Sequence, residues 1–319
     1  MATRAPGKHY REGISIMELA DMFPDEATAT AWFEKLVWPN GRHCPHCGNT
    51  ETAKAPATKK QPYWCGACRK GFSVRIGTAL ENSKVPLRKW VFAIYLEMTS
   101  LKGVSSMKLH RDIKVTQKTA WFMLHRIREA WANEVEVMFT GPVEVDETHI
   151  GGKRKNMSNA RRRELKDAGR GAVGKTAVAG IRDRDTNAVS ARVVQSTDKP
   201  TLQGFIRETV EPGSQVYTDE SKSYGRMDGY KHESVNHSIS EYVRDQVHAN
   251  GVESFWSMLK RGYHGVYHHM SAKHLHRYVG EFAGRHNMRE ENTMEQMEAV
   301  VAGLVGKRLM YRDLIGKRP

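Results

Sequence analysis

The stretch "PVEVDETHIGG", residues 142–152, carries the alternation of apolar and polar residues that indicates the fold class. Val143 and Val145 alternate with polar residues, which is the period of a β-strand with one buried face. We expect Asp146 at the end of this short strand, where a carboxylate can escape burial and face a site. The stretch therefore predicts a strand that carries an acidic residue to a functional edge.

The segments that follow predict more strands and a helix. Residues 175–194 predict a β-hairpin that turns around "DRDTN", and residues 199–210 predict the helix after it. Residues 214–221, "SQVYTDES", predict a short buried strand that ends in Asp219. Because turns favour aspartate, each acid taken alone is more simply explained as a structural residue.

A third acid lies on a predicted amphipathic helix, "HANGVESFWSMLKR", residues 248–261. Asn250, Glu253 and Lys260 recur at helical spacing and share one face. The apolar residues of the stretch fall on the other face: Val252, Phe255, Trp256 and Leu259. A solvated surface helix would also explain this pattern. The polar residues of this helix therefore indicate a functional site only in combination with the two aspartates.

Together the three acids suggest a metal site. Two divalent ions about 3.5–4 Å apart need bridging and flanking carboxylates, and such a pair activates water and stabilises the leaving oxygen of a phosphodiester. Magnesium suits this chemistry because it prefers oxygen ligands and keeps several waters. We therefore expect Asp146, Asp219 and Glu253 to bind two Mg²⁺ ions, which Mn²⁺ could replace, and Lys260 to contact the nearby phosphate.

Other polar residues compete with these acids or support them. Glu147 and Glu220 each follow one of the aspartates, so strand alternation turns them to the opposite face. Glu144 shares the face of Asp146. It is a candidate for hydrogen-bonding a metal ligand without binding the metal itself. The same supporting role is open to three residues close in sequence, although ordinary polar packing explains them equally well: His237, His248 and Asn250.

Composition points to a polyanionic partner. The 319 residues carry a net charge of +14 and a pI near 9.6, and Lys and Arg bind phosphates by displacing counterions. Residues 151–175 form a basic, glycine-containing loop without the apolar stripe of a membrane helix, although a loop without any partner remains an alternative. No apolar run approaches the roughly 20 residues that span a bilayer, and the N-terminus lacks a secretory signal, so we expect a cytoplasmic protein. The loop supplies candidate DNA contacts: Lys153, Arg154, Lys155, Arg161, Arg162 and Arg163.

All four cysteines fall in two Cys-x-x-Cys pairs, Cys44 with Cys47 and Cys65 with Cys68. Each pair presents two thiolates to one ion, and two pairs complete a tetrahedral site. Four thiolates leave no open position, so we expect one structural Zn²⁺ in a zinc ribbon. Redox pairs or disulfides are the less favoured alternative, since the cytosol disfavours disulfides.

The region after Pro86 predicts helices, with Ser105 and Thr116 as N-caps. Two helices joined by a short turn resemble a helix-turn-helix, although plain helix packing explains the periodicity equally well. The second helix supplies candidate DNA contacts at Gln117, Lys118 and Arg126, and the helix of Glu253 supplies Lys260 and Arg261.

At this point the chain resembles the bacterial insertion-sequence transposases of the zinc-ribbon-bearing DDE kind, called ISXO-like. The resemblance spans roughly residues 25–290. Its motifs are "CPHCG", "YWCGACRKGFSVRIGTALENSKVPL", "VEVDETHIGGK", "VYTDES", "VNHSISEYV" and "HANGVESFWSMLKRGYHGVYHHMSAKHLHRYVGEFAGRHN". The sequence departs from the pattern at His149, where tyrosine is expected, and at Ala249, where threonine is common.

The resemblance implies an α/β catalytic domain of the ribonuclease-H-like kind, a mixed sheet flanked by helices, preceded by a zinc ribbon and a helix-turn-helix-like module. It implies that Asp146, Asp219 and Glu253 are the metal-binding triad and that Lys260 is their basic companion. The implied activity is binding of terminal inverted repeats, cleavage at the element's ends, and joining of the 3′ ends to target DNA. Two ends need two active sites, so we expect a homodimer or larger assembly on double-stranded DNA.

Two other functions stay open from the sequence. One is a ribonuclease-H-like nuclease acting on hybrids or junctions, and the other is a DNA-binding regulator derived from a transposase. The expected domains are an N-terminal helical segment (1–40), the zinc ribbon (41–80), the helical module (81–135), the catalytic domain (140–290) and a C-terminal helical tail (291–319).

Overall fold

The computed structural model describes residues 12–131, 138–166, 172–219, 223–225, 227–235 and 250–316. The chain divides into two compact units, one of Met1–Asn133 with Met288–Pro319 and the other of Glu134–Asn287. The C-terminal residues therefore belong with the N-terminal half of the chain, which the sequence did not reveal. No helix within the described ranges is both long and apolar enough to cross a membrane.

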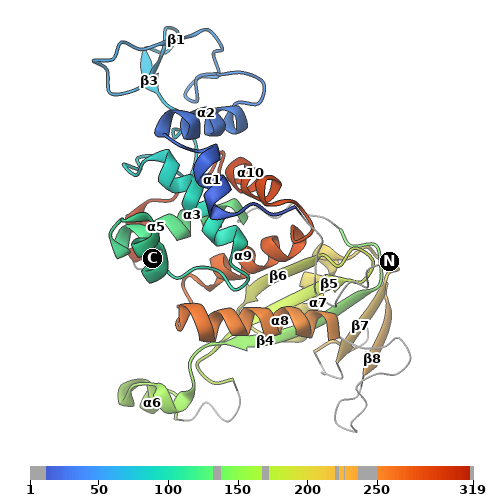
Figure 1. The fold of residues 1–319 in the computed structure, drawn as a ribbon. Helices are drawn as coiled ribbons and strands as arrows, with labels where there is room; N and C mark the ends of the chain where they lie inside the picture. Colours follow the sequence, from blue (N-terminus) through green and yellow to red (C-terminus); the bar gives the residue numbers. More distant parts are fainter. Residues whose placement is uncertain are drawn as a thin grey trace, which may run out of the picture. The chain divides into compact units, whose positions relative to one another are not determined.

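The first unit combines a small sheet with helices (Figure 1). The three-stranded sheet has the order β1-β2-β3, with both neighbouring pairs antiparallel. Its strands are β1 (Thr52–Lys54), β2 (Tyr63–Cys65) and β3 (Lys70–Phe72). The helices are α1 (Ile16–Met22), α2 (Glu26–Val37), α3 (Leu87–Thr99), α4 (Ser106–Ile113), α5 (Gln117–Arg128), η1 (Glu129–Trp131), α10 (Thr293–Gly303) and α11 (Tyr311–Ile315).

The ribbon has a small aromatic core. Tyr63 and Phe72 are buried, and Trp38, which follows α2, packs edge-on against both rings at 5.9 Å. Trp64, between Tyr63 and Cys65, is 40% exposed because it lies on the other face of β2. An aromatic residue from outside the ribbon therefore completes its core.

The predicted pair of helices forms α4 and α5, which contact one another. Both expected N-caps are present, since Ser105 accepts from the backbone N–H of Lys108 and Thr116 from that of Thr119. The connecting turn begins at Lys114, whose φ of 49° is left-handed and ends α4.

The C-terminal segment returns to these helices. α10 packs on α3 and α2. Beyond it, Leu304 accepts a hydrogen bond from the backbone N–H of Ala79, and Gly306 donates one to the carbonyl of Gly77. These contacts fasten the end of the chain to the segment that follows the ribbon.

The second unit is built on a five-stranded sheet of order β6-β5-β4-β7-β8. β5 runs antiparallel to both β4 and β6, whereas β7 runs parallel to both β4 and β8. The strands are β4 (Val143–Ile150), β5 (Thr176–Asp183), β6 (Val189–Val194), β7 (Gln215–Asp219) and β8 (Lys231–Val235). The helical elements are η2 (Arg154–Asn156), α6 (Asn159–Glu164), α7 (Lys199–Thr209), α8 (Asn250–Gly262), η4 (Tyr263–Tyr267) and α9 (Leu275–Asn287).

Helices cover both faces of this sheet. The even-numbered positions of β5, such as Val178, pack with Val252 of α8 and Val279 of α9. The odd-numbered positions, such as Ile181, pack with Phe205 of α7. Alternation along the strands thus builds two cores, and Figure 1 shows α8 lying along β4.

One sequence prediction about β4 is wrong. We expected Asp146 at the end of a short strand, but β4 continues to Ile150 because β5 pairs with it along its whole length. Only the beginning of β4 pairs with β7, so one side of the strand has no β7 partner from Val145 onward. Asp146 thus lies where the parallel pairing has stopped.

Candidate functional site: a carboxylate group on the mixed sheet

Asp146 and Asp219 lie on neighbouring strands of the second unit. β4 and β7 are parallel and pair Glu144 with Tyr217. The same register, continued along both strands, brings Asp146 opposite Asp219, the last residue of β7. The observed pairing ends two residues before each aspartate, and it directs both aspartates, far apart in the sequence, toward the same end of the strand pair.

The Asp146 carboxyl lies in a crowded acidic environment. Burial, and after it the neighbouring carboxylates of Glu147, Asp219 and Glu253, together raise the pKa of Asp146 to about 7. Since Asp219 and Glu253 both act on Asp146, three separate elements, β4, β7 and α8, direct acids toward one region. A bound cation would relieve the repulsion among them.

These carboxylates are not drawn into a tight cluster. Of the His, Cys, Asp and Glu side chains in the described ranges, only the four cysteines form a group whose ligand atoms all lie within 4.8 Å of one another. No choice of one oxygen each from Asp146, Asp219 and Glu253 thus brings all three oxygens within 4.8 Å of one another. Glu253 is exposed on α8, so its side chain has room to rotate.

Trp256 of α8 holds the Asp146 carboxylate in place. Its indole Nε1–H donates to Asp146 Oδ2 at 3.0 Å, and the side chain is 2% exposed. Gly180 pairs with Asp146 across the sheet, and a Cβ added to Gly180 would lie 2.5 Å from Cζ2 of the indole. The absence of a side chain at Gly180 therefore makes room for the ring that fixes Asp146.

Gly180→Ala is expected to destabilise the second unit by about 1–3 kcal/mol, because the added methyl group overpacks the space of the Trp256 ring. Urea unfolding would measure the change. Gly204→Ala on α7 is the matched control, since no atom of the described residues lies within 4 Å of a Cβ there and glycine is unfavourable in a helix by about 0.5–1 kcal/mol. Equal stability of the two variants would contradict the assigned role of Gly180.

Glu144 joins α8 to the sheet from a fully buried position. Its Oε2 accepts from the backbone N–H of Val252 at 2.9 Å, in the first turn of α8. Its Oε1 accepts from Arg184 Nε at 2.9 Å and from Arg182 Nη1 at 3.4 Å. A carboxylate at a helix N-terminus also interacts favourably with the helix dipole. Glu144 therefore fixes the turn of α8 that carries Glu253.

The approach of α8 to this carboxylate depends on a second glycine. A Cβ added to Gly251 would lie 1.9 Å from Arg182 Nη1 and 2.6 Å from Glu144 Oε2. Arg182 also hydrogen-bonds the side chain of Asn187 in the β5–β6 turn. The first turn of α8 thus packs against Arg182 of the β5–β6 hairpin as well as against Glu144 of β4.

Glu147 lies on the opposite face of β4 from Asp146, as strand alternation predicted. Its Oε2 accepts a hydrogen bond of 2.5 Å from the hydroxyl of Tyr224, a residue of the core beneath α7. Burial raises the pKa of Tyr224 well above its usual range, and the Glu147 carboxylate adds to the rise, so the phenol stays a donor. Tyr224 thereby fixes an acid whose charge raises the pKa of Asp146.

Basic groups adjoin the far end of β4. Burial lowers the pKa of His149, and the ammonium groups of Lys175 and Lys260 lower it further. Lys260 and Arg261 are exposed on α8. The same helix therefore presents an acid near its start and cations near its end, as the spacing of Glu253 and Lys260 predicted.

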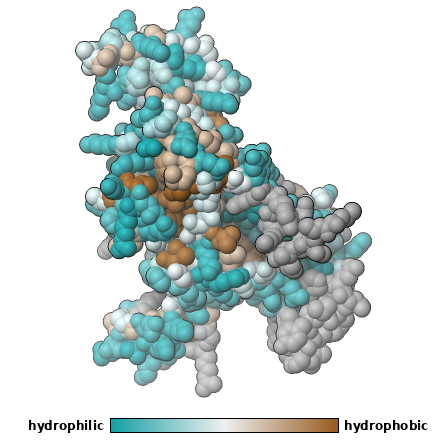
Figure 2. Space-filling view, in the orientation of Figure 1, coloured by the Kyte–Doolittle hydropathy of each residue, from teal (hydrophilic) through white to brown (hydrophobic). Residues whose placement is uncertain are grey.

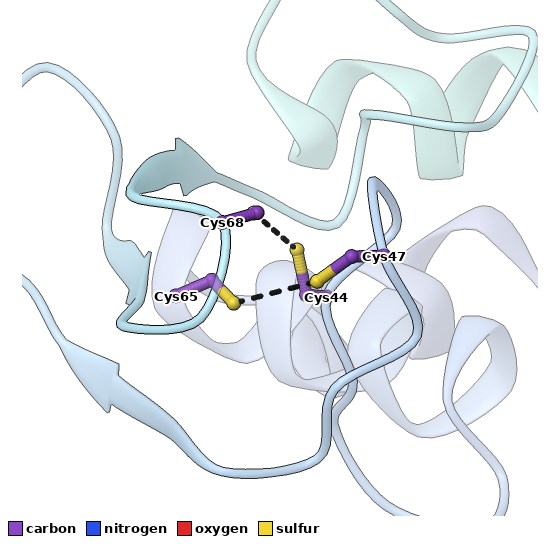
Figure 3. Close-up of side chains that lie close together, drawn as sticks. All are labelled: Cys44, Cys47, Cys65 and Cys68. Atoms are coloured by element: carbon purple, nitrogen blue, oxygen red, sulfur yellow. Dashed lines mark hydrogen bonds between the residues drawn. The ribbon is translucent and has the colours of Figure 1, made fainter.

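The four cysteines in the first unit form a compact group (Figure 3). Cys44 Sγ lies 3.6 Å from Cys68 Sγ, and Cys47 Sγ lies 3.6 Å from Cys65 Sγ. Disulfide sulfurs are about 2.05 Å apart, whereas sulfurs bound at about 2.3 Å to one tetrahedral zinc lie roughly 3.8 Å from each other. A hydrogen bond from the Cys68 backbone N–H is the main cause that lowers the pKa of Cys65 to about 6. The group suits a structural zinc ion.

The basic loop after β4 holds most of the predicted DNA contacts. Arg154 donates to the carbonyl of Leu165 at 2.8 Å, which joins the two ends of the segment that contains α6. Hydrophilic residues cover the surface of α6 (Figure 2). The side chain of Arg161 is not among those that the structure describes. The other five predicted cations of the loop are exposed: Lys153, Arg154, Lys155, Arg162 and Arg163.

The DNA contacts predicted for the helical module differ in their exposure. Gln117 and Lys118 are exposed at the start of α5. Arg126, by contrast, is only 5% exposed and donates to the carbonyls of Glu81 and Leu309. Burial lowers the pKa of Arg126 to about 10. The prediction that Arg126 contacts DNA is therefore corrected: its guanidinium instead satisfies backbone groups of the fold.

The remaining predicted residues differ in what the structure describes. Asn250 is exposed and begins α8. His237 and His248 lie outside the described residues. The sequence missed Trp256, Arg182, Arg184 and Tyr224 as supports of the site. A buried tryptophan at helical spacing gave no sign that its N–H would face a carboxylate.

Comparison with known proteins gives the family. The family model of the ISXO2-like transposase domain matches residues 138–287, and that of the transposase zinc-ribbon domain matches residues 24–71. A "transposase-like protein" of Haemophilus influenzae is 33% identical over 100 residues, which cover 31% of this chain and 80% of that protein. This chain belongs to the ISXO2-like transposase family. A protein in the transposable element ISH50 of Halobacterium salinarum is 29% identical over 248 residues, 75% of this chain and 83% of that protein.

The two family matches coincide with the two sites. The ISXO2-like domain contains β4, β7 and α8, and so the whole carboxylate group. The zinc-ribbon match contains all four cysteines. In this ISXO2-like transposase the acidic site and the sulfur site thus belong to separate units of the chain.

Proposed function

We propose that this chain cuts DNA at the terminal inverted repeats of its own insertion sequence and joins the freed 3′ ends to target DNA. The observation that carries the proposal is the β4–β7 register, which would bring Asp146 opposite Asp219 if it continued past Glu144 and Tyr217; the charge of Glu253 on α8, which raises the pKa of Asp146, supports it. A ribonuclease-H-like fold is part of the proposal. It is supported by three antiparallel strands, β6-β5-β4, continued by the parallel strands β7 and β8, with helices on both faces.

Asp146, Asp219 and Glu253 would hold divalent cations in this proposal. Carboxylate oxygens are the ligands that Mg²⁺ prefers, and burial together with the neighbouring acids raises the pKa of Asp146. A pair of such ions, when bound, activates the attacking hydroxyl or water and stabilises the departing 3′ oxygen. Rotation of the exposed Glu253 side chain would bring it to the two aspartates.

The chain's own residues orient the site. The Trp256 N–H fixes one oxygen of Asp146, Oδ2. Glu144 fixes the first turn of α8 and so the position of Glu253. Lys260, with Lys175 beside His149, supplies positive charge for a phosphate next to the acids.

DNA binding is distributed over both units. The ribbon, with one Zn²⁺ on its four thiolates, and the start of α5 would hold the element's end, with Gln117 and Lys118 toward the groove. The exposed cations around α6, together with Lys260 and Arg261, would contact flanking or target phosphates. Joining two ends requires two active sites, so the working form is a dimer or larger assembly.

Substrate choice tests this proposal. Purified protein with Mg²⁺ is expected to nick a duplex ending in the element's inverted repeat far more readily than an unrelated duplex or an RNA–DNA hybrid, and EDTA should stop the reaction. Nicking products are measured on denaturing gels. Preference for the hybrid would indicate a general nuclease, whereas specific binding without any nicking would indicate a regulator.

A further inference from the structure

The exposed start of α5 shares a surface with the end of the chain. Tyr311 of α11 packs edge-on against Phe122 at 5.6 Å and against Trp121 at 6.3 Å. Its ring also lies 4.4 Å from the ammonium of Lys118. A molecule that docks on the start of α5 therefore meets residues near Tyr311 at the same time.

The rest of α5 is closed to such a molecule. Met123 to Arg128 are all buried. Arg128 is paired with the buried Glu97 at 3.4 Å, and Arg126 is turned inward to backbone carbonyls. The surface available to DNA is thus the first two turns of α5 together with whatever flanks them. Two elements flank them: α4, and the C-terminal segment through Tyr311.

That segment, residues 304–316, carries exposed cations. The side chains of Arg308 and Arg312 are 62% and 78% exposed. Two acids are near them: Glu81 Oε1 lies 3.8 Å from Arg308, and Asp313 Oδ1 lies 3.7 Å from Arg312. Ion pairs this open contribute little and exchange readily for other partners. Asp313 also accepts from the backbone N–H of Met310, which holds the start of α11.

We propose that the start of α5 and the C-terminal segment form one DNA-binding surface, in which Arg308 and Arg312 contact backbone phosphates beside the groove that α5 enters. This inference rests on the proposed function of the helical module. An α-helix with its side chains is about 10–12 Å wide, and the major groove is about 12 Å wide. A segment packed against the side of the helix therefore meets the wall of the groove, which is made of phosphates.

Tyr311 gives this surface its geometry. Its ring packs on Trp121 and Phe122, so it fixes the spacing between α5 and α11. Leu309 and Leu314 are buried on either side of it, which anchors the segment while Arg308 and Arg312 point outward. The anchoring residues and the charged residues alternate closely, as expected for a segment that packs on one side and binds on the other.

The test is the salt dependence of binding. For the full-length Arg308→Ala/Arg312→Ala variant we expect weaker binding to the inverted-repeat duplex and to an unrelated duplex by the same factor. The slope of log K against log salt should fall by about 2, roughly 1 for each phosphate contact. Fluorescence anisotropy would measure it. Arg308→Lys/Arg312→Lys is the matched control and should keep most of the slope.

The outcomes separate this inference from the function on which it rests. The exposure of both arginines predicts an unchanged Tm for the alanine variant, so weaker binding would not reflect unfolding. If Lys118→Ala weakens binding while the double alanine variant binds with the wild-type slope, the C-terminal surface is refuted and the helical module stands. If neither variant weakens binding, DNA binding by the helical module itself fails.

Discussion

Asp219→Asn is expected to lower strand cleavage by more than about 10²-fold while binding to the element's ends keeps its wild-type affinity. Removing one group that stabilises charge in a transition state costs about 10²–10³-fold. Asparagine preserves the size of the side chain at the end of β7 but removes the negative charge that would hold a cation opposite Asp146. Cleavage of a labelled inverted-repeat duplex and anisotropy on the same duplex would give the two quantities.

A neighbouring acid provides the control for this prediction. Glu233 is exposed on β8, next to β7, and accepts a hydrogen bond from Gln215 at 2.8 Å. Glu233→Gln removes a negative charge from the same sheet without touching the carboxylate group, so it should cleave like the wild type. If Asp219→Asn also cleaved at the wild-type rate, the assignment of the triad would be wrong.

The sequence predicted the elements of the site well because each has a short-range pattern. Helical spacing separates Glu253 and Lys260 from Val252, Phe255 and Leu259, and the structure buries those apolar residues on the other side of α8. Strand alternation likewise turns Glu147 away from Asp146. The Cys-x-x-Cys spacing needed only the ribbon turns to bring four sulfurs together.

The sequence could not predict contacts that depend on distant segments. Arg126 reads as one more cation on a basic helix, and its burial depends on the carbonyl of Leu309, which lies far along the chain. The Trp256–Asp146 hydrogen bond likewise requires the packing of α8 over Gly180, which periodicity does not encode. β4 extends past Asp146 because its partner β5 does, and pairing length is a property of two strands rather than one.

Glu144→Ala is the substitution expected to cost the most stability, about 3–5 kcal/mol. Breaking a buried ion pair by removing one partner leaves the other charge uncompensated, and costs of this size follow. Glu144 is fully buried, and the side chains of Arg182 and Arg184 are only 19% and 15% exposed. For a unit of this size the loss corresponds to a fall in Tm of about 10 °C, measurable by circular dichroism.

A matched control tests whether the burial of Glu144 causes the expected loss of stability. Glu208 pairs with Arg192, but their side chains are 63% and 41% exposed, so Glu208→Gln should change stability by less than about 1 kcal/mol. A similar loss for Glu208→Gln and Glu144→Ala would contradict the buried role of Glu144.

Glu144→Gln separates shape from charge at the start of α8. Its amide oxygen can still accept from the Val252 N–H, but it no longer neutralises Arg182 and Arg184. We therefore expect a smaller loss of stability than in Glu144→Ala. Because the Val252 turn carries Glu253, any displacement of that turn should lower cleavage more than end binding. Glu253→Gln should also lose cleavage, but at an unchanged Tm, because Glu253 is exposed. Equal Tm values for Glu144→Gln and Glu253→Gln would show that α8 is held in place without the Glu144 charge.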